Sequence, residues 1–211
     1  MKNLETLRLI AELKKIRAPG VFNQYAEVDP EYDVPGADAI RRENLAAYIE
    51  IFGKAKAILV GEAPSFHGCR FSGIPFMSEE LLVGERRLEW AGPERFGRTS
   101  RRERPMSEHS ASIVWETLGA RRDVILWNAF PWHTYKPGDR TANRKPTDNE
   151  LKRSAEVLRL FVGLFPKSKV VAVGRTAEHA LDVIGVQAEY IRHPARGGKP
   201  GFVKGLNHLS F

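Results

Sequence analysis

Four short segments of this 211-residue chain carry side chains of the kinds that bind or cleave a ligand. They are GEAPS (61–65), GIPF (73–76), NAFPWH (128–133) and HPARGG (193–198). The first, third and fourth directly follow runs rich in apolar or β-branched residues, which are typical of strands. We therefore expect their polar side chains to gather where those strands end.

Two of these segments offer groups for acid–base or electrostatic catalysis. Glu62 follows the first apolar run, where a carboxylate can orient water or stabilise a developing positive charge. His193 follows the last run, and an imidazole can donate a hydrogen bond to an oxygen that gains negative charge. Each also has a plain structural interpretation, because an ordinary Gly/Pro turn and a lone structural histidine give the same local pattern.

Asn128 and Phe76 are candidates for contacting a planar heterocycle. The Asn128 amide offers one acceptor and two donors, so it can read both a ring N–H and a carbonyl on the edge of a pyrimidine. Phe76 follows Gly and Pro in a loop and can present its ring for stacking on a base. The alternatives are a strand-end turn former and a core phenylalanine. His133 is either a contact for phosphate or substrate or a surface histidine.

The segment after His193 is predicted to contact nucleic acid. Its glycines, Gly197 and Gly198, lie between the basic residues Arg196 and Lys199. Such a loop can bind phosphates or enter a groove of DNA, and its alternative is a solvated basic turn.

Charge favours a polyanionic partner. The chain has 33 Lys and Arg against 26 Asp and Glu, which gives a formal charge of +7 and an isoelectric point near 9.6. Nucleic acid is the first candidate, although the same charge also keeps a protein soluble. Seven arginines fall within residues 84–104, which we expect to be an exposed insertion between the first two strands.

Several other classes of protein are excluded or disfavoured. A single cysteine, Cys69, cannot form an internal disulfide or supply the four thiolates of a zinc or iron–sulfur site, and His67 beside it adds only one ligand. We therefore expect no metal. No run of about 18 apolar residues is present, so we expect no membrane span and a cytoplasmic location. Dinucleotide-binding, P-loop and nucleophile-elbow motifs are absent.

Alternating strand and helix patterns predict the scaffold. Strands are expected at 57–61, 124–128, 170–174 and 189–193. Helices are expected at 3–17, 38–52, 148–164 and 175–184. This order predicts an α/β fold with three αβα layers and a central, mainly parallel four-stranded sheet. Sites in such sheets lie beyond the carboxyl ends of the strands. The length favours a single domain over 1–211.

Finer features of the helices are also predicted. Asp38 and Asp148 are expected to be N-caps, since a side-chain oxygen can accept a hydrogen bond from the first turn. In the second helix, Arg41 and Arg42 are expected on the exposed side.

The ordered set GEAPS, GIPF, NAFPW and HPARGG, spread over residues 61–198, resembles the uracil-DNA glycosylase superfamily. It is most similar to compact bacterial members whose first motif is G-E-A-P, as in the iron–sulfur branch. The resemblance implies a four-stranded parallel sheet between helices. It also implies a monofunctional glycosylase that hydrolyses the N-glycosidic bond of a nucleotide flipped out of DNA, in base-excision repair. No cofactor is implied, and we expect a monomer.

The resemblance also implies roles for single residues. Glu62 would activate water or stabilise charge, and Phe76 would stack on the base. Asn128 resembles the amide that reads the uracil edge, and His193 resembles the histidine that steadies the leaving base through its O2 carbonyl. The loop with residues 196–199 would penetrate the helix where the base has left.

The first motif implies further substrate contacts and also contains departures from the family pattern. Gly61, Ala63 and Ser65 would be substrate-binding positions. Many members carry Asp or Asn where this chain has Ala63, which moves the water-activating role to Glu62. Ser65 stands where some members hold a tyrosine that excludes the thymine methyl. In the last motif Ala195 replaces a common serine, and the four cysteines of the iron–sulfur branch are reduced to one.

These departures leave two alternatives open. One is a non-catalytic nucleic-acid-binding module that keeps a base pocket. The other is a glycosylase for another deaminated base such as hypoxanthine, because pocket shape rather than fold decides the substrate.

Overall fold

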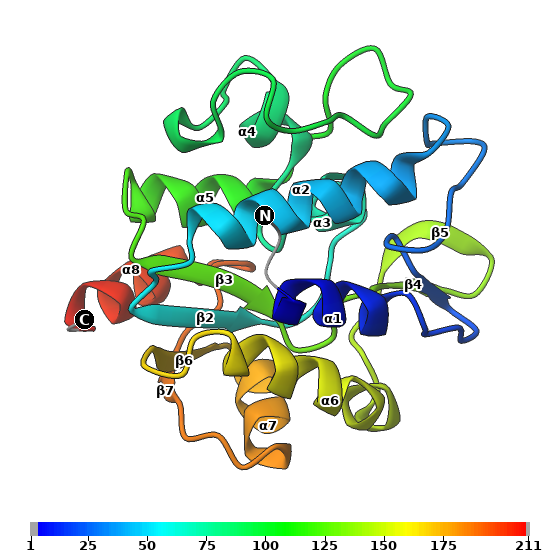
Figure 1. The fold of residues 1–211 in the computed structure, drawn as a ribbon. Coiled ribbons are helices and arrows are strands. Elements are labelled where there is room, and N and C mark those ends of the chain that lie inside the picture. The colour runs from blue at the N-terminus through cyan, green and yellow to red at the C-terminus, as the bar shows by residue number, and fades with distance from the viewer. Residues whose placement is uncertain (1–3, 210–211) are drawn as a thin grey trace.

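The computed structural model describes residues 4–209, and its main sheet has four parallel strands. The strands are β2 (Ala57–Gly61), β3 (Val124–Asn128), β6 (Lys169–Val173) and β7 (Glu189–Ile191), in the order β3-β2-β6-β7. Helices lie on both faces of this sheet (Figure 1). The predicted α/β fold with a parallel four-stranded sheet is therefore confirmed.

Burial on both faces explains the composition of the two central strands. All residues of β2 and β3 are buried, as expected for strands covered by helices above and below. The pairing aligns Gly61 with Asn128, so both strands end at one level. On one face, Trp127 stacks on Phe161 with ring centroids 3.8 Å apart. The polar residues after β2 and β3 thus begin side by side.

Six longer helices surround the sheet. They are α1 (Leu4–Leu13), α2 (Ala37–Ile51), α5 (His109–Leu118), α6 (Asp148–Gly163), α7 (Arg175–Val183) and α8 (Lys199–His208). Figure 1 shows α2 and α5 on one face and α6 and α7 on the other. Shorter helical segments are α3 (Cys69–Ser72), α4 (Glu79–Val83) and η1 (Glu89–Ala91). No helix in the described part of the chain is long and apolar enough to cross a membrane.

A second, antiparallel sheet was not predicted. It consists of β1 (Val21–Phe22), β4 (His133–Lys136) and β5 (Asp139–Asn143), in the order β1-β4-β5. Its strands are short, and β5 is polar and almost wholly exposed, so no apolar alternation marks it in the sequence.

Three predicted helix boundaries need correction. The first helix ends at Leu13 rather than at residue 17, and its predicted start at residue 3 lies outside the described residues. Gly36, not Asp38, occupies the N-cap of α2 and makes no side-chain capping bond. Thr147, not Asp148, caps α6, because the Thr147 hydroxyl and the Glu150 carboxylate bond each other's backbone N–H groups.

Arg41 is buried, contrary to the prediction that it faces solvent. Its guanidinium lies 2.5 Å from the carboxylate of Asp33, which also pairs with Arg70. Both Arg41 and Asp33 are fully buried. Buried charges require such partners, and the residues before α2 supply this one.

The arginine-rich segment 84–104 lies between β2 and β3 in the sequence, as predicted, but it is only partly exposed. Trp90 is buried, and Thr99 and Ser100 are anchored by the Glu79 carboxylate, which accepts hydrogen bonds from both backbone N–H groups. The segment is therefore fixed to the body of the protein at several points.

Candidate functional site

A cavity of about 80 Å³ opens where β2 and β3 end. It is lined by Glu62, Ala63, Pro64, Ser65, Cys69, Phe76, Glu108, Ser110, Asn128 and His193. The structure therefore brings together Glu62, Ala63, Ser65, Phe76, Asn128 and His193, which sequence analysis had singled out in separate segments.

Glu62 is held at the end of β2 by its backbone and by its side chain. Its carbonyl accepts a hydrogen bond from the Phe130 N–H at 3.0 Å, and the Gly61 carbonyl accepts one from Ala129 at 2.8 Å. These bonds extend the β2–β3 pairing past the strands. One carboxylate oxygen, Oε2, accepts a hydrogen bond from the Thr176 hydroxyl at 2.6 Å. The carboxylate is thus fixed on the cavity wall.

His193 lies two residues beyond β7, because that strand ends at Ile191 rather than at the predicted residue 193. Its Nδ1 accepts a hydrogen bond from the Ala195 N–H at 3.1 Å. A backbone N–H can only donate, so Nδ1 is unprotonated and the neutral ring carries its proton on Nε2. The ring therefore has a hydrogen-bond donor to offer.

Burial lowers the pKa of His193. The negative charge of Glu62 opposes this effect, whereas Arg192 and Arg196 add to it. The imidazole is consequently neutral at neutral pH, which agrees with the hydrogen bond that Nδ1 accepts.

Asn128 ends β3 with only 3% of its surface exposed. Its side chain lines the cavity and forms no hydrogen bond with any residue within 4–209. The amide is thus available to a ligand in the cavity.

Phe76 adopts a strained backbone conformation beside Asn128 and His193. Its φ of 53° is in the left-handed region, and its carbonyl accepts a hydrogen bond from the Trp115 indole at 2.9 Å. The ring lies over the position of Gly61, where an added Cβ would come within 2.1 Å of the Phe76 ring. Gly61 therefore provides space for this ring, and its contribution to the site is indirect.

The remaining wall contains residues that sequence analysis missed. Glu108 caps α5 by accepting hydrogen bonds from the N–H groups of Ser110 at 2.9 Å and Ala111 at 2.7 Å. Among the described residues, the hydroxyls of Ser65 and Ser110 have no hydrogen-bond partner and are free to meet a ligand. The helix α5 was not predicted, so nothing in the sequence placed Glu108 or Ser110 here.

The residues of the predicted DNA-contacting loop differ in exposure and in their partners. Arg196 is exposed and forms no ion pair with any residue that the structure describes, and its φ is 52°. Lys199 begins α8 and pairs with Glu116 at 3.3 Å. Gly197 has a φ of 74°, which favours glycine. Gly198 is buried, and a Cβ on it would lie 1.9 Å from the His193 carbonyl oxygen, so it allows the loop to fold back on that residue.

His133 is neither a surface histidine nor part of the cavity. It is buried in β4, with Nδ1 3.1 Å from the Pro64 carbonyl oxygen and Nε2 3.0 Å from that of Arg140. Burial lowers its pKa. His133 thus ties the GEAPS loop to the small sheet.

The residues present do not fit an iron–sulfur cluster. Such a cluster needs about four thiolates, and the sequence has one cysteine. Cys69 is buried against Tyr25 and Gln24, and burial raises the pKa of its thiol to about 12. Across residues 4–209 no group of three or more His, Cys, Asp or Glu side chains could hold a metal ion.

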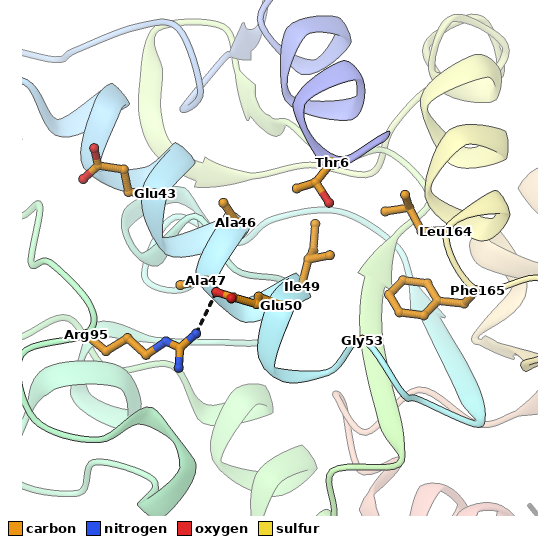
Figure 2. Close-up of a pocket in the computed structure, with 10 residues that line it drawn as sticks. All are labelled: Thr6, Glu43, Ala46, Ala47, Ile49, Glu50, Gly53, Arg95, Leu164 and Phe165. Atoms are coloured by element: carbon orange, nitrogen blue, oxygen red, sulfur yellow. Dashed lines mark hydrogen bonds and ion pairs between the residues drawn. The ribbon is translucent and has the colours of Figure 1, made fainter. Parts of the chain in front are cut away.

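A larger cavity of about 450 Å³ lies elsewhere, between α1, α2 and the end of α6. Figure 2 shows its lining residues, with Arg95 paired to Glu50. Gly53 and Phe165, which also line it, precede β2 and β6. This cavity is therefore at the opposite end of the strands from Glu62 and Asn128.

A family model described as the uracil DNA glycosylase superfamily matches residues 50–205. The fold is similar to the crystal structure of wild-type Pedobacter heparinus SMUG2, with a TM-score of 0.58 and 13% sequence identity over 97% of this chain and 99% of that chain. A search of curated proteins found no match. The family match includes every residue that lines the 80 Å³ cavity.

Proposed function

This chain belongs to the uracil DNA glycosylase superfamily, and from that premise we propose that it hydrolyses the N-glycosidic bond of uracil, or of a related deaminated base, in DNA. Members of the superfamily are DNA glycosylases, which are hydrolases. The proposal adds the substrate, the flipping of the base into the 80 Å³ cavity and the roles of the side chains.

The chemistry demands opposite charges on the two sides of the breaking bond. As the C1′–N bond lengthens, its electron pair moves to the base and positive charge builds on the sugar. Water then bonds to C1′ through its oxygen, and the released base takes up one proton. An anion near the sugar and hydrogen-bond donors near the base therefore lower the barrier.

Three side chains meet this demand in the proposed mechanism. The Glu62 carboxylate stabilises the sugar cation or orients the attacking water. The Nε2–H of neutral His193 donates to the base oxygen that gains negative charge, and the Asn128 amide bonds the edge of the base. Phe76 stacks on the base and offsets part of the few kcal/mol that unstacking costs.

One observation supports this proposal most strongly. The Asn128 amide lines the cavity and forms no side-chain hydrogen bond with the described residues, and it shares this cavity with the carboxylate of Glu62 and the imidazole of His193. An unpaired donor and acceptor in such a place favours a ligand with a matching polar edge.

The test is an abasic-site assay on oligonucleotides that each carry one uracil, hypoxanthine, xanthine or mismatched thymine. We expect strand breakage at uracil after alkali treatment and none without alkali, as a monofunctional enzyme requires. Glu62→Gln, purified identically, is the control for contaminating host glycosylase.

The other outcomes separate the alternatives. Cleavage at hypoxanthine but not at uracil would replace the proposed substrate. Binding to damaged DNA with no cleavage of any base would favour the non-catalytic module.

A further inference from the structure

The turn after β6 lies between the two candidate catalytic side chains. In the sheet, β6 is flanked by β2 and β7, which are followed by Glu62 and His193. The turn between β6 and α7 consists of Gly174 and the first residues of α7, and no chemistry was expected of it from its sequence. The sheet order alone places this turn next to both groups.

Thr176 in this turn contacts Glu62 directly. Its side-chain oxygen Oγ1 donates a hydrogen bond to Glu62 Oε2 at 2.6 Å, and the residue is only 6% exposed. Hydrogen bonds to an ionised carboxylate are short and stronger than neutral ones. Among the described residues, Thr176 is the hydrogen-bond partner of the Glu62 carboxylate, whose other oxygen accepts no hydrogen bond from the protein.

The same turn supports His193. Gly174, with a φ of 92°, donates its N–H to the Ile191 carbonyl at 3.0 Å. A Cβ on Gly174 would lie 3.2 Å from the Cβ of His193, so the turn packs closely beneath that residue. A single segment thus contacts both Glu62 and His193.

We propose that Thr176 is a positioning residue for Glu62. Its hydroxyl fixes one carboxylate oxygen at the start of α7 and leaves the other for the sugar or water. This inference rests on the function proposed above, because it assumes that Glu62 acts in bond cleavage. A glutamate has three side-chain torsions, and fixing them before the reaction removes an entropic cost from the chemical step.

The test is a double-mutant cycle with single-turnover cleavage of uracil-containing DNA as the readout. Thr176→Val removes the hydroxyl but keeps the shape, and we expect it to slow cleavage about tenfold or more with DNA affinity nearly unchanged. Thr176→Ser keeps the hydroxyl and should restore a rate within a few-fold of the parent. In a Glu62→Ala background, Thr176→Val should have almost no further effect.

The control is Thr117→Val in α5, since the Thr117 hydroxyl donates to the Ile113 carbonyl within its own helix. It should leave cleavage unchanged. Equal slowing by Thr176→Val with and without Glu62, or no slowing at all, would overturn the proposal.

A second readout separates this inference from the proposed function. Crystal structures of the parent and Thr176→Ser should show one Glu62 conformer, whereas Thr176→Val should show a displaced or multiple Glu62 side chain. If the parent cleaves no base, the proposed function fails, and the positioning role is then judged by these structures. An unchanged Glu62 conformer in Thr176→Val would refute it.

Discussion

The hydrogen bond from the Ala195 N–H to Nδ1 makes His193 a donor through Nε2 in its neutral state. In the proposed mechanism, this donor stabilises negative charge on the base without a full positive charge on the imidazole. The same proposal has Asn128 bond the edge of the base through an amide, which does not titrate. Of the three residues Glu62, Asn128 and His193, the proposed mechanism uses only Glu62 in a charged form.

A pH prediction follows from the lowered pKa of His193. Its ordinary pKa is 6.5 and burial lowers it, so the neutral form predominates at pH 6.5 and above. The single-turnover rate should therefore not increase as the pH is lowered from about 8 to 6.5, and it should decrease once the ring becomes protonated. A stopped-assay pH profile checks this, with the exposed His67→Gln as control. A rate that rises as pH falls through 6.5 would instead indicate a protonated histidine acting as an acid.

The sequence located some site residues and missed others for a physical reason. Glu62, Asn128 and His193 directly follow apolar runs, and parallel strands align their carboxyl ends. Three other residues lie in the first turns of helices or just before them: Glu108, Ser110 and Thr176. Polar residues are common at helix starts in any protein, so their presence there does not indicate a functional site. Whether these residues lie near the cavity depends on which strands are neighbours in the sheet. The strand order β3-β2-β6-β7 cannot be predicted from local sequence patterns.

At the scale of elements, the strand runs were predictable because helices cover both faces and demand apolar residues throughout. The small sheet was missed because β5 is polar and exposed. Arg41 was misplaced because its burial depends on Asp33, which reaches it only in the folded chain. Sequence patterns thus identified the four strands of the main sheet and the helices α1, α2, α6 and α7, whereas the burial of Arg41 depends on a long-range ion pair.

The end of β2 and the Phe76 loop are closely fitted, which gives a second prediction. Gly61→Ala would place a methyl group within 2.1 Å of the Phe76 ring, so the ring must shift from its present position in the cavity wall. We expect weaker binding of uracil-containing DNA and slower cleavage, while DNA without a damaged base binds as before. Gly163→Ala at the end of α6, where an added Cβ has no neighbour within 4 Å, is the matched control. Unchanged binding of the damaged strand by Gly61→Ala would contradict a stacking role for Phe76.

At the scale of the whole molecule, the charge of +7 suits a polyanionic substrate. Several arginines of segment 84–104 are nevertheless committed within the protein: Arg95 pairs with Glu50, and Arg98 lies 3.9 Å from Glu79. Exposed Arg196, which follows the cavity residue His193, is better placed to meet a phosphate.

The corresponding prediction concerns salt. Affinity for DNA should fall by orders of magnitude between roughly 50 and 200 mM salt, because phosphate contacts release counterions. Fluorescence anisotropy with a labelled duplex measures this, and Arg196→Ala should reduce the slope of log affinity against log salt by about one. Affinity that does not change with salt would exclude the proposed DNA contacts.

The most direct test of the central claim is the single-turnover rate of uracil release by the parent and by His193→Ala, at enzyme concentrations that saturate binding. We predict that the parent releases uracil. The variant loses a donor needed mainly in the transition state, so its rate should fall by about two orders of magnitude while its affinity for uracil-containing DNA changes only a few-fold. A folded His193→Ala variant that releases uracil as fast as the parent would contradict the account.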